Sequence, residues 1–374
     1  MFHAYAKLNR LIVALCLLAA AMVAAPPAPA APASSPAPAA EPAAKLRAKA
    51  GAYYFDGWTG QTFHITDRLR TEFAAREPVW GWRDDSPEVM RRQIDYAADA
   101  GLAFFSFCWY YPEGAKKETP LNSALELYLK APNRDRLQFC LLVANHGGYK
   151  IGPNEWDAVS RRWIELFKSP AHLKVGDKPL LIIFAPGELV KSFGSAKAVR
   201  EAFTSLRAMA KAQGIPDVAI AACVRDSQYF KMLEECGYTL FTGYNYPGFG
   251  ATGTEKKQPF AGMIEGHMKI WDNFLESPLP YIPAVTTGWD MRPWEPAANP
   301  PGSLFYPDRT PAEVGRFVSQ AIAWLDRHPD KATPDRLIVL YAWNENGEGG
   351  YLTPTQSDGT AWLDAVKKAL SGGP

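Results

Sequence analysis

The sequence has little cysteine and none of the short motifs that mark metal, nucleotide or serine-hydrolase sites. Only 5 of its 374 residues are cysteine. No CxxC or HExxH spacing is present, so no metal centre is predicted and no cofactor is expected. No predicted strand runs directly into a GxGxxG turn and no GxxxxGK[ST] loop exists, which removes the usual landmarks of nucleotide binding. No GxSxG elbow supports Ser-His-Asp hydrolysis.

The sequence also lacks a surplus of either charge. Lys and Arg total 40 against 39 Asp and Glu, which gives a formal net charge of +1. Because nucleic-acid binding depends on a basic surface, nucleic acid is not expected as a partner. What the chain does contain is 47% hydrophobic and 13% aromatic residues, the composition of a globular protein with a sizeable core.

The N-terminal segment has the pattern of a secretory signal. Lys7 and Arg10 precede an apolar run over 11–25, which is followed by Ala-Pro-Ala repeats suited to cleavage. The alternative, an uncleaved membrane anchor, fits less well because the run is shorter than the roughly 20 residues that span a bilayer. We therefore expect a signal peptide over 1–31, a Pro/Ala-rich linker over 32–50, and a secreted or periplasmic protein without stable membrane insertion.

Four cysteines follow the predicted signal peptide. Cys108, Cys140 and Cys223 lie in strongly apolar runs, where a free thiol behaves as a small hydrophobe. With Cys236, they are expected to be buried thiols rather than disulfides, although an oxidising compartment would permit bridges.

Eight short apolar runs alternate with amphipathic helical patterns through the rest of the chain. The clearest helix begins with the capping box Thr310-Pro311-Ala312-Glu313. Eight strands alternating with eight helices predict a single (β/α)8 barrel over 51–374, with an open doubly wound sheet as the alternative. The predicted strands are 51–55, 102–109, 137–144, 179–185, 218–224, 239–245, 281–287 and 337–343.

Polar and aromatic residues follow nearly every predicted strand. In a (β/α)8 barrel the active site lies at these carboxyl ends, and aromatic faces beside amides and carboxylates are typical of a carbohydrate cleft. The alternatives are rim packing for the aromatics, a structural role for the histidine, and, for Asp290, a pair with Arg292. The predicted substrate-binding residues are Asp56, Trp58, Trp109, Tyr110, Asn145, His146, Tyr244, Asn245, Trp289, Asp290 and Asn344; Glu188, Arg225 and Asp226 follow other strands.

The eighth predicted strand ends in two carboxylates three residues apart. Glu345 and Glu348 lie among glycines that let the backbone approach a ligand. Glycosidic cleavage needs one carboxyl to protonate the leaving oxygen and another on the nucleophilic side. We predict this pair as the catalytic residues, with solvated loop charges as the alternative.

The segment YAWNENGEGGYLTP (341–354) resembles the closing motif of the glycoside hydrolase family 99 and WbsX-like superfamily. Five other stretches also resemble segments of this superfamily: GAYYFDGW, FFSFCWYY, LLVANHGGY, GDKPLLIIF and VTTGWDMRP. The resemblance therefore covers about 51–374. It implies a (β/α)8 barrel and retaining, endo-acting cleavage of α-mannosidic bonds. By the same resemblance, Glu345 would be the base on the 2-hydroxyl, giving an anhydro-sugar, and Glu348 the general acid/base. Asn346 and Gly347 depart from the family's usual Trp and from the mannosidases' His.

Three functions follow from these features. The first is a secreted glycoside hydrolase acting on an oligo- or polysaccharide, expected as a monomer. The second is a glycosyltransferase in surface-polysaccharide assembly, the activity ascribed to WbsX-type relatives; export argues against it, because nucleotide-sugar donors are cytoplasmic. The third is a non-catalytic carbohydrate-binding barrel, which would not need both carboxylates.

Overall fold

The computed structural model describes residues 46–112, 119–297 and 301–372. The predicted signal peptide lies outside the described residues, as does the predicted linker up to residue 45. The first strand begins at Lys49, and Ala48 and Ala50 are buried in the core. Residues 48–50 of the predicted linker are therefore part of the barrel, before the predicted start at position 51.

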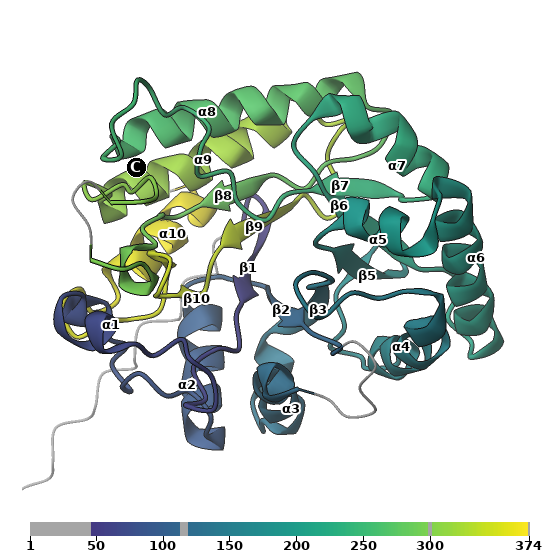
Figure 1. Ribbon diagram of the computed structural model, residues 1–374, viewed down its shortest axis with the longest axis horizontal. Coiled ribbons are helices and arrows are strands. Elements are labelled where there is room, and N and C mark those ends of the chain that lie inside the picture. The colour runs from purple at the N-terminus through teal and green to yellow at the C-terminus, as the bar shows by residue number, and fades with distance from the viewer. Residues whose placement is uncertain (1–45, 113–118, 298–300, 373–374) are drawn as a thin grey trace, which may run out of the picture. The chain divides into compact units, whose positions relative to one another are not determined.

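Eight parallel strands form a barrel, as the alternating pattern predicts (Figure 1). Their order around the sheet is β7-β6-β5-β3-β2-β1-β9-β8. A single bridge between Phe241 and Tyr281 joins the two outermost strands and closes the ring. The eight predicted strands correspond to β1 (Lys49–Tyr54), β2 (Phe104–Trp109), β3 (Gln138–Val143), β5 (Lys178–Ile183), β6 (Ala219–Cys223), β7 (Leu240–Thr242), β8 (Ala284–Thr286) and β9 (Leu337–Tyr341).

Helices surround the barrel, and their amphipathic faces pack on it (Figure 1). The predicted capping box of α9 is confirmed, because Thr310 accepts from the Glu313 N–H and the Glu313 carboxylate accepts from the Thr310 N–H, both at 3.2 Å. The helices are α1 (Asp67–Thr71), α2 (Pro87–Asp99), α3 (Ser123–Lys130), α4 (Pro153–Phe167), α5 (Pro186–Phe193), α6 (Ala196–Ala212), α7 (Phe230–Cys236), α8 (Phe260–Asn273), α9 (Pro311–Arg327) and α10 (Ala361–Ser371).

Short elements decorate the ends of the barrel strands. The two-residue strand β4 (Lys174–Val175) pairs antiparallel with β5, and β10 (Asn344–Glu345) pairs with β11 (Gly350–Tyr351) to form a hairpin directly after β9. The short helices α1 and α5, together with β4, β10 and β11, are not among the predicted elements. The 3-10 turns are η1 (Ala74–Arg76), η2 (Pro120–Asn122), η3 (Arg134–Arg136), η4 (Ser227–Tyr229), η5 (Phe274–Glu276) and η6 (Arg292–Trp294).

The strands are buried on both faces, which is why they read as continuous apolar runs. The four cysteines in the described part of the chain are free thiols, as expected, and only Cys223 is partly accessible. No helix within the described residues is long and apolar enough to span a membrane.

Side-chain amides tie neighbouring strand ends together. Asn344 accepts from the Phe55 N–H and donates to the Phe55 carbonyl, both at 2.7 Å. Asn145 binds the N–H and carbonyl of Ala185 in the same way, at 2.9 and 2.8 Å. Each amide thus imitates a strand partner where the regular ladder ends. A third such clamp joins Asn122 to Tyr110.

One GxGxxG spacing does occur, at 248–253 in the loop between β7 and α8. It begins well past the end of β7 and stops before the helix starts, so it does not form a strand-to-helix phosphate turn. Gly250 has φ of +87°, and a Cβ there would overlap the backbone of Gly262 in α8. The glycine at position 250 therefore allows the backbone of this loop to lie close to the backbone of α8.

Candidate active site

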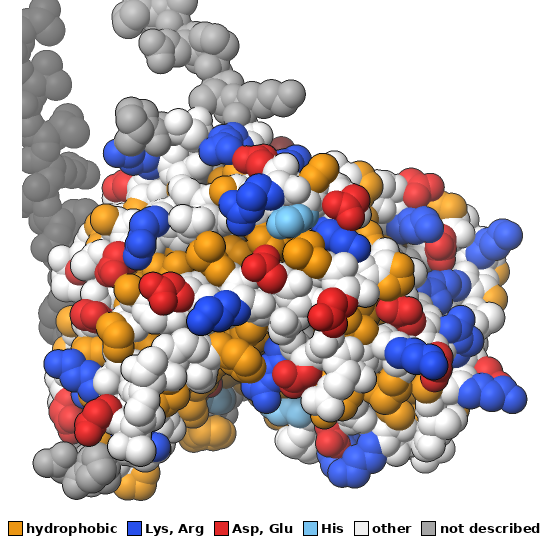
Figure 2. Space-filling view, turned by 90° about the horizontal axis from the view of Figure 1, so that it is seen from above, with side chains coloured by type: hydrophobic (Ala, Val, Ile, Leu, Met, Phe, Trp, Pro, Cys, Tyr) orange, Lys and Arg blue, Asp and Glu red, His pale blue; other side chains and the backbone are white. Residues whose placement is uncertain are grey.

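A cavity of about 360 Å³ lies at the carboxyl ends of the barrel strands. This size falls within the range of ligand sites. On the face of the molecule shown in Figure 2, Lys and Arg are interspersed with Asp and Glu, without a field of one sign. The wall residues come from the ends of β1, β2, β3, β5, β7, β8 and β9: Phe55, Phe63, His64, Cys108, Tyr110, Leu121, Leu142, Ala144, His146, Gly147, Tyr149, Phe184, Tyr244, Trp294, Glu345 and Glu348.

Both predicted catalytic carboxyls lie in this cavity, on the β10–β11 hairpin. The Tyr244 hydroxyl donates to Glu345 Oε1 at 2.7 Å, and the Tyr341 hydroxyl donates to Glu348 Oε2. The other oxygen of Glu345, Oε2, is buried and has no hydrogen-bond partner among the described residues. One tyrosine thus orients each carboxyl, and Glu345 keeps one oxygen available for a ligand.

The electrostatics of the pair favour a shared proton. Burial raises the pKa of Glu348 to about 7, although the hydrogen bond from Tyr341 opposes this shift. Burial, and then the charge of Glu348, raises the pKa of Glu345 well above its ordinary value, against the opposing hydrogen bond from Tyr244. Since two adjacent buried carboxyls do not both ionise readily, the pair holds a proton at neutral pH. One member can then donate a proton while the other accepts one.

Glycines allow the hairpin to fit against its neighbours. Gly349 has φ of +75°, in the left-handed region that favours glycine. A Cβ at Gly347 would overlap the ring of Trp294, which belongs to η6 after β8. Trp294 in turn donates from Nε1 to the His64 carbonyl at 2.9 Å. The residue that departs from the mannosidase motif at position 347 therefore gives room to an indole ring in the cavity wall.

Three of the predicted substrate-binding residues line this cavity with the two carboxyls. They are Tyr110, His146 and Tyr244. Burial lowers the pKa of His146, so the ring is neutral at pH 7 and can exchange hydrogen bonds with sugar hydroxyls. A fourth predicted residue, Asn245, lines an adjoining cavity.

Four other predicted residues line neither of these two cavities and instead hold segments of the barrel together. Asn145 and Asn344 use both ends of their amides in the strand clamps, so their polar groups are already satisfied. Asp56 is 2% exposed and accepts from the Ala124 N–H in the first turn of α3. Trp58 is also 2% exposed and donates from Nε1 to the Asn344 carbonyl at 2.8 Å.

Trp109, Trp289 and Asp290 also lie outside both cavity walls. Trp109 is 1% exposed and packs edge to face on Trp163, with ring centroids 5.7 Å apart. Trp289 packs near the ring of Tyr341, with centroids 6.1 Å apart.

Charged groups near the strand ends are also paired. Asp290 forms ion pairs with Arg76 and Arg292. Although burial raises the pKa of Asp290, the hydrogen bond from Arg292 and the charge of Arg76 hold it below its ordinary value. Of the two roles considered for Asp290, pairing with Arg292 is the one the structure contains. Glu188 lies in the first turn of α5, 3.4 Å from the Lys150 ammonium.

Several wall residues are absent from the predicted set. Phe55 and Phe184 end or follow apolar runs, so their strand-end position is the signal that could identify them. Phe63 and His64 lie in an irregular loop and Trp294 in the short turn η6, where no local pattern marks a cavity wall. Tyr341 is the last residue of β9, and its hydroxyl reaches Glu348. Within 46–112, 119–297 and 301–372, no cluster of three His, Cys, Asp or Glu side chains could hold a metal ion.

Comparisons with known proteins relate this geometry to a family. The model of the family described as Glycosyltransferase WbsX matches residues 82–366. An uncharacterised protein, WxcX of Xanthomonas campestris pv. campestris (strain B100), is 24% identical over 323 residues, which cover 77% of this chain and 42% of that protein. The chain thus spans about two-fifths of this relative's length.

Solved structures share the barrel. A GH99 endo-alpha-mannosidase from Bacteroides thetaiotaomicron superposes with a TM-score of 0.62 at 14% identity, over 86% of this chain and 96% of that one. A glycoside hydrolase-like protein gives a TM-score of 0.65 at 14% identity, over 90% and 97%. At this identity the similarity establishes the (β/α)8 fold.

Proposed function

Since the chain belongs to the WbsX family and has a barrel fold shared with glycoside hydrolases, we propose that it hydrolyses glycosidic bonds of an oligo- or polysaccharide. The observation that carries this proposal is the buried pair Glu345 and Glu348 in an aromatic-walled cavity. Each carboxyl is oriented by a tyrosine hydroxyl, and burial raises both pKa values. A binding protein would have no need for a pair poised to share one proton.

The roles of the two carboxyls follow from their positions. Glu348 is the more exposed of the two, and its pKa of about 7 suits a group that gives a proton to a leaving oxygen and later takes one back. Because burial and the charge of Glu348 raise the pKa of Glu345 well above its ordinary value, the proton of the pair must pass from Glu345 to Glu348 before Glu345 can act as the base. The unpartnered Oε2 of Glu345 supports this role, because a sugar hydroxyl there would satisfy it.

The walls of the cavity support a sugar as the substrate. Phe63 is 80% exposed at the rim, and the ring of His64 stacks on it with centroids 4.2 Å apart. Flat apolar faces of this kind pack against the C–H face of a pyranose. The α-mannosidic, endo-acting specificity implied by the family resemblance is a part of the proposal that needs its own test, because the motif differs at Asn346 and Gly347.

The deciding experiment is a glycan screen with matched variants. The unmodified protein and three variants would be incubated with α-mannans and other bacterial and plant polysaccharides, and the released products identified by mass spectrometry. The variants are Glu345→Gln, Glu348→Gln and the exposed control Glu165→Gln. Cleavage by the protein and by Glu165→Gln, with at least about a 100-fold loss in both site variants, is the expected result. An aryl glycoside with a good leaving group should restore Glu348→Gln more than Glu345→Gln. If the unmodified protein and its variants bind a glycan and none of them cleaves it, the hydrolase proposal is rejected in favour of a carbohydrate-binding barrel.

The family's description supplies a second candidate, glycosyl transfer. It would show as consumption of a nucleotide sugar with an added residue on an acceptor. Arg225, near the site, is ion-paired with Asp226 at 3.3 Å, and Arg76 and Arg292 share the single carboxylate of Asp290. Among the described residues, none that lines the cavity with Glu345 and Glu348 is Lys or Arg. That arrangement favours hydrolysis over binding of a diphosphate.

We also propose that the chain is exported, on the basis of its first 31 residues. Expression in a Gram-negative host, followed by fractionation and N-terminal sequencing, tests this directly. A mature N-terminus near residue 32 in the periplasm or medium supports export, whereas an intact Met1 in the cytoplasm contradicts it.

A further inference from the structure

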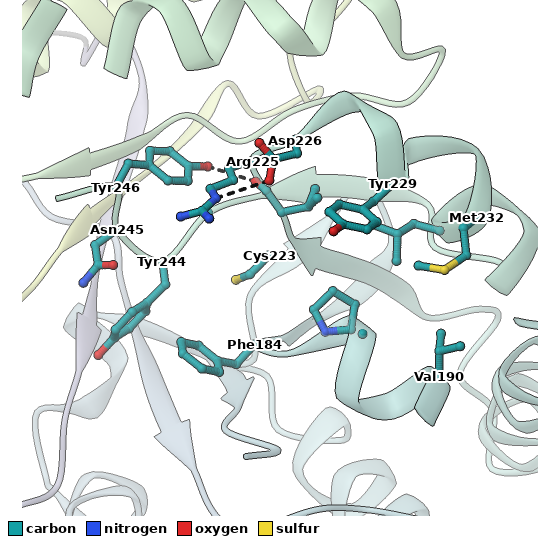
Figure 3. Close-up of a pocket in the computed structure, with 15 residues that line it drawn as sticks. Phe184, Val190, Cys223, Arg225, Asp226, Tyr229, Met232, Tyr244, Asn245 and Tyr246 are labelled. Atoms are coloured by element: carbon teal, nitrogen blue, oxygen red, sulfur yellow. Dashed lines mark hydrogen bonds and ion pairs between the residues drawn. The ribbon is translucent and has the colours of Figure 1, made fainter. Parts of the chain in front are cut away.

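A second cavity of about 550 Å³ adjoins the one that holds the carboxyl pair (Figure 3). It lies at the carboxyl ends of β5, β6 and β7 and is bounded outside by α5 and α7. Phe184 and Tyr244 line both cavities, and their ring centroids are 5.1 Å apart. These two rings form the partition, and the Tyr244 hydroxyl on this partition is the group that holds Glu345.

The walls of the second cavity are of two kinds. One side is apolar, with Val190 from α5 and Met232 and Leu233 from α7. The opposite side carries polar groups, among them the Asn245 amide and the Arg225–Asp226 pair (Figure 3).

A half-exposed aromatic ring, Tyr229, lies at the rim of this cavity. Phe63 is the corresponding exposed ring of the catalytic cavity. Each cavity thus has an accessible aromatic ring at its rim, and the two cavities lie side by side with Phe184 and Tyr244 between them.

The polar side of the second cavity is connected to the catalytic pair. Asn245 directly follows Tyr244, whose hydroxyl donates to Glu345 at 2.7 Å. A ligand that contacts Asn245 in the second cavity would therefore lie next to the residue that orients one carboxyl of the pair.

The apolar side chains of this cavity offer no hydrogen-bond partner to a sugar hydroxyl. The hydroxymethyl group of an ordinary hexose, placed against Val190 and Met232, would lose its hydrogen bonds to water without replacement, which is unfavourable. A methyl group at that position would gain from burial. Ring hydroxyls of the same sugar could still meet Asn245 and the charged pair on the other side.

We propose that the second cavity is a binding site for a methyl-bearing sugar unit of the substrate, a 6-deoxyhexose, next to the bond that Glu345 and Glu348 cleave. The inference rests on the proposed function for the cleaved bond, whereas the site itself is defined by binding alone. An O-acetyl group could supply the same methyl chemistry, so the experiment separates these two sources.

The test uses pairs of sugars that differ by one hydroxyl. The full chain carrying Glu345→Gln and Glu348→Gln would be titrated with two such pairs. The first pair is methyl α-D-rhamnopyranoside and methyl α-D-mannopyranoside, and the second is methyl α-L-fucopyranoside and methyl α-L-galactopyranoside. Methyl 6-O-acetyl-α-D-mannopyranoside is the acetylated sugar. Binding would be followed by ligand-observed NMR. The 6-deoxy member of at least one pair should bind about tenfold more tightly than its partner, because the partner buries an unpaired hydroxyl.

Two substitutions locate the binding. Gly187 lines the second cavity in the first turn of α5, and a Cβ added there would have no neighbouring atom within 4 Å, so Gly187→Leu fills the cavity and should abolish the preference. Gly248 is equally open and lines neither cavity, so Gly248→Leu is the matched control and should keep it. Val190→Thr keeps the volume but adds a hydroxyl and should reduce the preference several-fold.

The outcomes are distinguishable. Equal binding within every sugar pair, or a preference unchanged in both Gly187→Leu and Val190→Thr, overturns the inference even if the protein cleaves glycans. Tighter binding of only the acetylated sugar overturns the 6-deoxyhexose assignment. Deoxy-sugar binding that Gly187→Leu removes, in a protein that cleaves no glycan, supports the site and rejects the hydrolase proposal.

Discussion

The ring of Trp294 lies directly against Gly347, in the space that any side chain at position 347 would need. The two residues come from different strand ends, the loop after β8 and the hairpin after β9. Their contact joins the wall of the catalytic cavity to the segment between the two carboxyls. Position 347 therefore sets how closely the indole ring approaches the catalytic pair.

Gly347→Ala should displace Trp294 and lower both activity and stability. Overpacking of this kind costs about 1–3 kcal/mol, and kcat/KM on a cleaved glycan should fall with it. Thermal unfolding and steady-state kinetics measure the two effects. Gly248→Ala, at an open position, is the control, and Trp294→Leu in the Gly347→Ala background should restore stability. Unchanged kinetics and stability in Gly347→Ala would contradict the role of this contact.

Activity should fall as the pH rises through about 7, because burial raises the pKa of Glu348 to about 7 and the proposed acid must keep its proton. Tyr341→Phe removes a donor to the Glu348 carboxylate, so the pKa should rise further and the alkaline limb of kcat/KM should move to higher pH. Tyr128→Phe is the control, since that hydroxyl bonds the Leu137 carbonyl at the opposite end of the barrel. An alkaline limb that stays in place in Tyr341→Phe would argue against Glu348 as the acid.

Glu348→Gln should stabilise the protein at alkaline pH while it removes activity. A carboxyl whose pKa is raised on folding contributes stability that is fully present below its unfolded pKa of about 4.5 and lost as the pH rises through about 7. The amide does not ionise, so the stability of the variant relative to the parent should increase by about 1–3 kcal/mol between pH 4 and pH 8. Urea unfolding at both pH values measures this difference. Glu165→Gln, in an exposed position, should show no such trend.

Asn145→Ala should cost stability, because it leaves the partly buried N–H and carbonyl of Ala185 without their partner. Unpaired groups of this kind cost about 1–3 kcal/mol. KM for a cleaved glycan should change little, since Asn145 lies outside the cavity wall. Asn245→Ala is the matched amide substitution and should leave the melting temperature nearly unchanged. A large rise in KM with unaltered stability in Asn145→Ala would restore the predicted substrate contact.

The barrel can be predicted because its signal is local. A strand buried on both faces must be a continuous apolar run, and each of the eight runs is visible without knowledge of its neighbours. The short helix α5 is not evident in the sequence because it follows β5 directly and is only eight residues long. Glu188 is consequently expected at a strand end and instead lies in the first turn of this helix.

The site is only partly predictable because the use of a polar side chain depends on distant partners. An amide at a strand end has the same appearance in the sequence whether it binds a sugar or a neighbouring backbone. Asn344 binds Phe55, which lies 289 residues away in the chain. The position of Glu345 and Glu348, by contrast, follows from the end of a single strand, and that strand end is recognisable.

Both proposed catalytic carboxyls lie on one short hairpin, whereas the walls of their cavity come from the ends of six other strands and the loops after them. A change in one of these loops would alter one part of the substrate contact and leave the spacing of the two acids, which the hairpin sets, as it is. Relatives with the same acid pair and different loops are expected to share a reaction and differ in the glycans on which they act.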